Sequence, residues 1–253
     1  MQIFGIDLWR IILCIVLIFL VVMRANLVAL FAIRSYGKGD TEKALKIFSV
    51  ASKVGNLNVS NRLTYAYLLL RSGYPDKAQR ELRLLLPYTK VKSAERYRLK
   101  NLMALSHWKL NNLSEAIEEM EEIIQDGYKN TLIYQNLGLL YNLGDNPEKA
   151  IRFNEEAYEY NSDDNVIADN LADAYHLGGE TEKALKIYEE LFARKNEPNF
   201  PEAYYGYGRL LIEVGDRDKG MEFLEKALSK PFSYLSVISK SDVEDLLGSI
   251  KEI

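Results

Sequence analysis

Residues 39–48 read GDTEKALKIF and residues 179–188 read GETEKALKIY, so nearly the same ten residues occur twice in one chain. Related copies begin at Gly73 (GYPDKAQREL) and at Gly144 (GDNPEKAIRF). A small residue within this string recurs along the chain at spacings of 34, 38, 34, 34 and 36 residues: Ala44, Ala78, Ala116, Ala150, Ala184 and Gly220. The first four spacings add up to the distance between the two matching strings, so the similarity is not chance. The chain contains an internal repeat.

Two further series keep the same register. Twelve residues upstream of each small residue stands another small one, in the series Ala32, Ala66, Ala104, Gly138, Ala172 and Gly208. Seven residues downstream stands an apolar one, in the series Ala51, Leu85, Ile123, Ala157, Leu191 and Ala227. Small side chains at two fixed points let two antiparallel helices approach closely where their axes cross. Each repeat is therefore predicted as helix, turn and helix.

Residues that favour helix termini support this division. The predicted turns lie near glycines, at Gly39, Gly73, Gly144, Gly178 and Gly215. Pro147 suits the first position of a helix, with Asn146 before it as the N-cap. The composition is rich in Ala, Leu, Glu, Lys and Arg, which favour helix, and no convincing strand with a period of two residues is present. We therefore expect an all-α protein.

The repeat resembles the tetratricopeptide repeat. The best match is residues 131–164, where the motif reads Tyr134, Leu137, Gly138, Tyr141, Ala150 and Ala157. His107 replaces a usual tyrosine, and Asn154 replaces a large apolar residue of the family pattern. The resemblance implies a right-handed α-solenoid of about six helix–turn–helix repeats within residues 25–234. Their expected ranges are 25–58, 59–96, 97–130, 131–164, 165–200 and 201–234.

The C-terminal residues predict a helix that closes the array. Ser241 and Glu244 have the spacing of a capping box. Val243, Leu246, Leu247 and Ile250 then form an apolar stripe at helical spacing. We expect a capping helix over 241–252, preceded by a linker at 231–240.

The N-terminal residues 1–24 are predicted to form a transmembrane helix. Ile3–Met23 supplies 21 residues, about 31 Å of helix, which matches a hydrocarbon core. A signal peptide is disfavoured because Arg10 is the only basic residue before the apolar run and no small-x-small site precedes Arg24. A soluble cap is disfavoured because residues 11–23 have no polar face.

The residues after this span predict its orientation. No Gly or Pro separates the span from the first repeat, so the two should form one continuous or barely bent rod. Arg24, Arg34 and Lys38 follow the span, whereas Arg10 before it is offset by Asp7. The positive-inside bias therefore favours a single-pass cell-membrane protein with cytoplasmic repeats. Repeats outside the cell, serving envelope assembly, would need only the opposite orientation.

Motifs for chemistry are missing from the sequence. Cys14 is the only cysteine, so no intramolecular disulfide can form. His107 and His176 are the only histidines, and we interpret both as packing or surface residues. The common metal, phosphate and nucleophile motifs do not occur. The sequence therefore predicts a protein that is not an enzyme and that has no catalytic residue, metal site or cofactor.

The resemblance implies a peptide-binding groove lined by the first helix of each repeat. The residues that would face this groove are Asn101, Gln135, Asn136, Asp169, Asn170, Asp173, Tyr205 and Arg209. Amide side chains can both donate to and accept from a peptide backbone, although Asn is common at this position whatever the repeat binds. The basic clamp of chaperone-binding members is not reproduced, since Gln135 and Asn136 occupy such a place. Acidic residues, including Glu202 and Glu213, favour a basic or neutral partner and disfavour nucleic acid.

The charge of the chain is divided unevenly. Residues 1–110 carry 18 Lys and Arg against 6 Asp and Glu, whereas residues 111–253 carry 14 against 30. The main hypothesis is a membrane-anchored scaffold that binds a protein or peptide partner in its groove. The alternative is a structural module that forms homo-oligomers through its basic and acidic halves.

Overall fold

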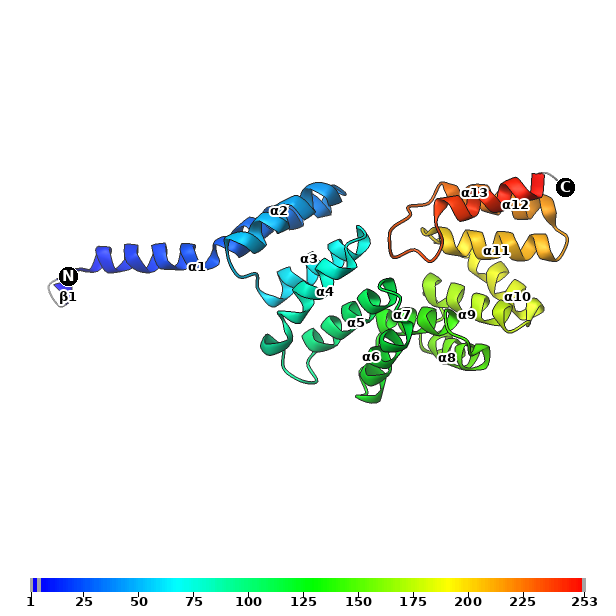
Figure 1. Ribbon diagram of the computed structural model, residues 1–253, viewed down its shortest axis with the longest axis horizontal. Coiled ribbons are helices and arrows are strands. Elements are labelled where there is room, and N and C mark those ends of the chain that lie inside the picture. Colours follow the sequence, from blue (N-terminus) through cyan, green and yellow to red (C-terminus); the bar gives the residue numbers. More distant parts are fainter. Residues whose placement is uncertain (1, 4–5, 252–253) are drawn as a thin grey trace. The chain divides into compact units, whose positions relative to one another are not determined.

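The computed structural model describes residues 2–3 and 6–251, and most of them are helical (Figure 1). The helices are α1 Leu8–Gly37, α2 Thr41–Val54, α3 Val59–Arg71, α4 Pro75–Arg83, α5 Ala94–Lys109, α6 Leu113–Gln125, α7 Thr131–Asn142, α8 Pro147–Tyr160, α9 Asn165–Leu177, α10 Thr181–Phe192, α11 Pro201–Glu213, α12 Arg217–Leu228 and α13 Lys240–Lys251. A short 3-10 helix, η1, spans Leu86–Tyr88. Two strands that the sequence did not predict, β1 Gln2–Ile3 and β2 Ile6–Asp7, pair antiparallel with Gln2 opposite Asp7. The N-terminal helix, predicted to include Ile3–Met23, therefore begins at Leu8. The helical prediction is confirmed for the rest of the described chain.

The chain forms two compact units, and the division falls inside α5. The first unit is Met1–Leu70 with Asp76–Leu102, and the second is Arg71–Pro75 with Met103–Ile253. Because α5 is one helix, this division does not coincide with a predicted repeat boundary. The exact division into six repeats stays a prediction.

The two series of small residues lie where helices touch, as the spacing predicted. Every alanine of both series is at most 1% exposed, and the three glycines are buried as well. Two of these glycines bring α11 and α12 close together. A Cβ on Gly208 would lie 2.9 Å from the carbonyl oxygen of Gly220, and a Cβ on Gly220 would lie 2.8 Å from that of Gly208. The backbones meet at these positions because neither residue has a side chain.

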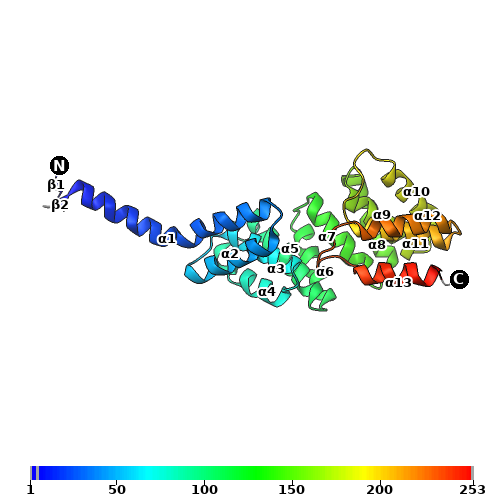
Figure 2. The same cartoon turned by 90° about the horizontal axis from the view of Figure 1, so that it is seen from above.

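Helix α1 is continuous, as predicted from the absence of a helix breaker after the apolar run (Figure 2). Ala25, Ala29 and Ala32 are fully buried, whereas the large apolar side chains of 12–22 are exposed. Where these two parts of α1 join, the Arg24 guanidinium donates to the carbonyl of Val54 and the Asn26 amide accepts from the backbone of Asn58. In the described part of the chain, Ile12–Gly37 is the one helical segment long and apolar enough to cross a membrane.

The helix termini confirm one predicted cap and correct another. Asn146 accepts from the backbone N–H of Lys149 at 3.0 Å, with Pro147 at the first helical position, as predicted. At the C-terminal helix, the capping box is formed by Ser239 and Asp242 rather than Ser241 and Glu244. The Ser239 hydroxyl accepts from the backbone of Asp242 at 3.1 Å, and the Asp242 carboxylate accepts from the backbone of Ser239 at 2.6 Å. This reciprocal pair starts α13 earlier than expected.

Helix α13 closes the core of the second unit, as its apolar stripe predicted. Val243, Leu247 and Ile250 are buried in one cluster with residues of α9, α10, α11 and α12. Stacked and edge-on aromatic rings fill the centre of this cluster, among them Tyr188 on Tyr207 at 5.3 Å between centroids. The core therefore holds α9 and α11, which carry most of the polar residues considered next, in fixed positions.

Candidate functional site

Helices α7, α9 and α11 share a face with polar side chains, here called the polar face: Gln135, Asn142, Asp169, Asn170, Asp173, His176, Arg209 and Glu213. Amide groups connect its first two helices. The Asn142 amide donates to the carbonyl of Asn170 at 2.8 Å, and the Asn170 amide donates to the carbonyl of Gln135 at 2.8 Å. Gln135 in turn donates to Asp164 at 2.8 Å. These bonds fix α7 beside α9.

Asn154 on α8 supports this face from behind. Its fully buried amide donates to Asn142 at 2.9 Å and to the carbonyl of Ala150 at 3.0 Å. The departure from the family's large apolar residue is therefore explained by a hydrogen-bonding partner on α7. Gly138 leaves room for it, because a Cβ there would lie 2.2 Å from the Asn154 side-chain oxygen.

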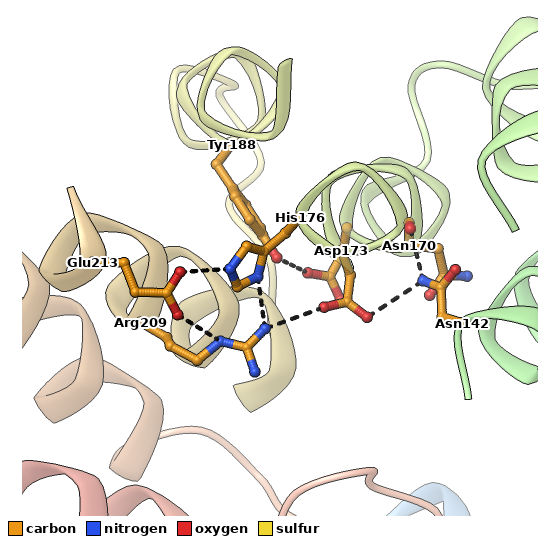
Figure 3. A network of polar contacts seen from close by, with 8 residues as sticks. Asn142, Asn170, Asp173, His176, Tyr188, Arg209 and Glu213 are labelled. Atoms are coloured by element: carbon orange, nitrogen blue, oxygen red, sulfur yellow. Dashed lines mark hydrogen bonds and ion pairs between the residues drawn. The ribbon is translucent and has the colours of Figure 1, made fainter. Parts of the chain in front are cut away.

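An ionic network joins α9 to α11 around Arg209 (Figure 3). The Arg209 Nη2 atom lies 2.7 Å from His176 Nδ1 and 3.7 Å from Asp173 Oδ1, and Nε lies 3.8 Å from Glu213 Oε1. His176 Nε2 lies 2.6 Å from Glu213 Oε2. Because a guanidinium only donates, His176 Nδ1 must accept, which assigns the ring proton to Nε2. The histidine therefore links a cation to a carboxylate.

Two aspartates on α9 have perturbed acidities. Burial raises the pKa of Asp169 well above its usual value, and the neighbouring Asp173 and Glu202 carboxylates raise it further. Tyr188 donates to Asp169 at 3.3 Å, which opposes this shift. Partial burial also raises the pKa of Asp173, whose side chain stays 36% exposed, while Arg209 and then His176 oppose the shift. The face therefore disfavours additional negative charge.

The structure brings together most of the predicted site residues. Gln135, Asn170, Asp173 and Arg209 belong to the contacts above, and Asp169 lies beside them. The guanidinium carbon of Arg209 lies 5.8 Å from the centre of the Tyr205 ring. Asn136 is half-buried on α7. Asn101 is buried on α5 in the first unit, so it is not part of this cluster. Whether any of them binds a partner stays a prediction.

Three residues of this site were missing from the prediction: Asn142, His176 and Tyr188. Glu213 was named among the acidic residues of the groove but not among the residues that would bind the peptide. The interpretation of His176 as a packing or surface residue was incomplete, because the half-buried ring lies between Arg209 and Glu213. The spacing of polar residues along α9 and α11 could have predicted this role of His176. Asp173 and His176 are three residues apart on α9, and Arg209 and Glu213 are four apart on α11, so each pair shares a helix face.

The site does not suggest a bound metal. Within the described residues, no group of three or more His, Cys, Asp and Glu side chains is arranged to hold a metal ion. Arg209 already places a fixed positive charge among the acidic groups. The arrangement suits hydrogen bonding and charge recognition rather than metal chemistry.

Comparison with known sequences identifies the repeat. Residues 101–165 and residues 201–229 match two sequence models, each described as Tetratricopeptide repeat. No curated protein sequence matches the chain. The matched residues include α7 and α11, on which much of the polar face lies.

Solved structures share the fold at low sequence identity. A tetratricopeptide repeat protein from Parabacteroides merdae superimposes with a TM-score of 0.74 at 18% identity, over 90% of this chain and 85% of that one. A thermophilic TPR protein of Thermus thermophilus gives 0.62 at 17%, over 78% and 100%. PilF of Pseudomonas aeruginosa gives 0.59 at 20%, over 89% and 97%. The likeness supports an all-helical solenoid and carries no information about partners.

Proposed function

We propose that this chain, which contains tetratricopeptide repeats, is a membrane-anchored, non-catalytic scaffold that binds an extended segment of a partner protein on its polar face. The repeat fold generally mediates protein–protein interaction, and no catalytic family matches the chain. The membrane holds the scaffold and its partner in two dimensions, so modest contacts suffice for capture. We further propose that the repeats are cytoplasmic, because basic residues follow the span.

The observation that carries the anchor is the exposed apolar stretch of α1. Its large side chains point to water on every side of the helix, and Ile15, Ile18 and Val22 are 60%, 64% and 67% exposed. In water this surface would be unfavourable by about 25 cal/mol per Å² of apolar area. A lipid environment removes that cost, and the continuity of α1 then fixes the first helix pair to the membrane.

The binding surface is supported by groups that remain accessible. The Asp173 and Arg209 side chains are 36% and 33% exposed, so each can contact a ligand while its internal partners hold it in place. A fixed pair of opposite charge recognises peptide main chain or a complementary side chain with little loss of conformational entropy.

The anchor is tested by fractionation of membranes washed with alkaline carbonate. Deleting residues 1–24 should move the chain to the soluble fraction. In the full chain, Val16→Arg with Leu20→Arg should reduce insertion, since each arginine near the centre of a span costs about 2.5–3.5 kcal/mol. Val50→Arg, at an exposed position on α2, is the matched control and should stay in the membrane. An unchanged membrane pellet after the deletion contradicts the anchor.

The binding face is tested by capture from detergent-solubilised membranes. Asp173→Asn combined with Arg209→Gln should retain at least about tenfold less of the partner that the parent chain captures, a loss of about 1.4 kcal/mol. Lys186→Gln is the control, because that side chain is 76% exposed on α10. Asn136→Ala with Asn170→Ala should also weaken capture. Full retention by both double variants would remove the face from the proposal.

Orientation and self-association need separate measurements. Protease digestion of sealed vesicles should cut the repeats only from the cytoplasmic side, and the opposite result favours an envelope role outside the cell. The uneven charge of the chain supports a homo-oligomer as the alternative function. Sedimentation of the chain without residues 1–24 should then show a dimer at low salt that dissociates at high salt.

A further inference from the structure

The connection between α12 and α13 is longer than a turn requires. Residues 229–239 join these two helices, whereas 178–180 join α9 to α10 and 161–164 join α8 to α9. Figure 1 shows the connection as a long loop that reaches away from α12 and α13 before it returns. Within it, Ser233–Ser236 form a turn, in which the backbone N–H of Ser236 donates to the carbonyl of Ser233 at 3.0 Å. Residues 231–239 are here called the strap. All residues that contact it below belong to the second unit.

The strap is held largely through its main chain. The Lys109 ammonium donates to the carbonyl of Ser236 at 3.0 Å. The Glu202 carboxylate accepts from the backbone N–H of Val237 at 3.2 Å. The carbonyl of Arg71 accepts from the backbone N–H of Tyr234 at 3.1 Å. Main-chain groups are common to all peptides, so another segment that forms the same turn could make the same three bonds.

The Tyr234 side chain of the strap packs between Gly73 and Lys109. The Tyr234 ring lies against Gly73, where a Cβ would come within 3.3 Å of the ring and where φ is +82°. Lys109 Nζ lies 5.4 Å from the centre of this ring and 3.7 Å from that of Trp108. Burial lowers the pKa of Lys109 to about 8, which agrees with an ammonium withdrawn from water. The site therefore accepts an aromatic ring beside a cation.

The strap is nevertheless only partly enclosed. Tyr234 is 45% exposed and Val237 is 39% exposed, while Phe232 and Ile238 at its two ends pack against the core. The ends thus fix the strap to the unit, and its centre rests on a few polar contacts. A segment held in this way can leave its site without unfolding the helices that frame it.

We propose that the strap occupies a second peptide site of this chain, made by Lys109, Glu202 and the turn at Gly73, and that a partner segment binds there by displacing it. The inference deepens the proposed function and rests on it, since it names the chemistry of a partner segment. That segment forms a turn like that of Ser233–Ser236, carries an aromatic side chain within the turn and has no acidic residue next to it. The strap itself carries no charged residue. The field of Glu202, which also reaches Asp169, disfavours acidic ligands.

The linked strap is a strong competitor for any external peptide. A segment attached by a short linker has an effective concentration in the millimolar range, which favours it by roughly 10²-fold or more over the same segment free in solution. The parent chain should therefore bind an external copy of the strap poorly. A chain whose strap cannot bind should bind that copy well.

The test uses the full chain in detergent and a fluorescent synthetic peptide of residues 230–240. Tyr234→Pro with Val237→Pro removes both strap N–H donors and the ring but keeps Phe232, Ile238 and the Ser239 cap. Fluorescence polarisation should show at least about 100-fold tighter binding of the peptide to this open variant than to the parent. If the double variant melts earlier than the parent, Val237→Pro alone replaces it, with a smaller gain expected.

Matched peptides and variants identify the contacts. A peptide N-methylated at position 237 should bind the open variant at least tenfold more weakly than one N-methylated at position 235, because only the first loses the donor to Glu202. Lys109→Met in the open variant should weaken binding, and Lys186→Gln should not. Equal binding by the open variant and the parent, or by the two methylated peptides, overturns the inference. No partner protein enters this assay, so its result is independent of the capture experiment on the polar face.

Discussion

The folded chain disfavours the negatively charged form of the Asp169 carboxyl group. Because burial and two carboxylates raise its pKa, the folded chain keeps this proton to a higher pH than the unfolded chain, whose Asp ionises near pH 4. The Asp169 carboxyl group therefore does not lower the free energy of unfolding at low pH, where it is protonated in both states. It lowers this free energy as the pH rises above about 4. Asp169→Asn removes that loss and keeps the acceptor for Tyr188. We expect the variant to gain about 1 kcal/mol at pH 7, or roughly 2–4 °C in Tm.

The pH dependence separates this explanation from a simple packing effect. Melting curves of parent and variant should converge near pH 4 and diverge toward pH 7. Asp145→Asn, at an exposed position in the turn before α8, is the control and should show no such divergence from the parent. A gain of equal size at both pH values would mean that the charge of Asp169 is not its cause.

The sequence alone predicted only part of the contact between Gly138 and Asn154. The periodic small residue identified Gly138 as a close contact, but the repeat pattern expected a large apolar residue in place of Asn154. A Cβ at Gly138 would collide with the Asn154 side-chain oxygen, so Gly138→Ala should cost about 1–3 kcal/mol. In an Asn154→Ala background the same change should cost at least ~1 kcal/mol less. Additive effects in urea melts would show that the two side chains do not meet.

The pair of helices α11 and α12 depends on two glycines rather than on large side chains. Gly208→Ala places a methyl group 2.9 Å from the carbonyl oxygen of Gly220 and should cost about 1–3 kcal/mol, despite the better helix propensity of alanine. Gly248→Ala on α13 has nothing within 4 Å and should instead gain about 0.5–1 kcal/mol. Thermal unfolding should therefore show a lower Tm for Gly208→Ala and a higher Tm for Gly248→Ala. If helix propensity decided both changes, both variants would melt at a higher temperature than the parent.

Helices were predictable and their connections less so, for a physical reason. Small residues at fixed spacing constrain both helices of a pair at once, so the positions of Ala150 and Gly208 in the repeat were enough to predict helix contacts. A cap depends on one or two hydrogen bonds, and Ser239 with Asp242 competes with Ser241 and Glu244 for the same helix start. The strap contacts Lys109 and Glu202 through its backbone, which leaves no residue pattern. The polar face was found in part, since distances between residues on different helices do not follow from spacing.

The apolar stretch of α1 can either cross a bilayer or lie along its surface, and the unbroken helix makes the two cases distinguishable. If α1 crosses the membrane from Leu8, its first 20 residues, about 30 Å of helix, end at Leu27, so Leu27 stands at the hydrocarbon edge and Gly37, the residue before Lys38, up to about 15 Å beyond it. The headgroup region is roughly 5–8 Å deep on each side, so it includes Leu27 and excludes Lys38. With Trp9 and Trp108 replaced by Phe, Leu27→Trp should show blue-shifted emission and quenching by brominated lipids, whereas Lys38→Trp should show neither. Equal quenching at both positions would place the whole helix along the surface and remove the spanning anchor.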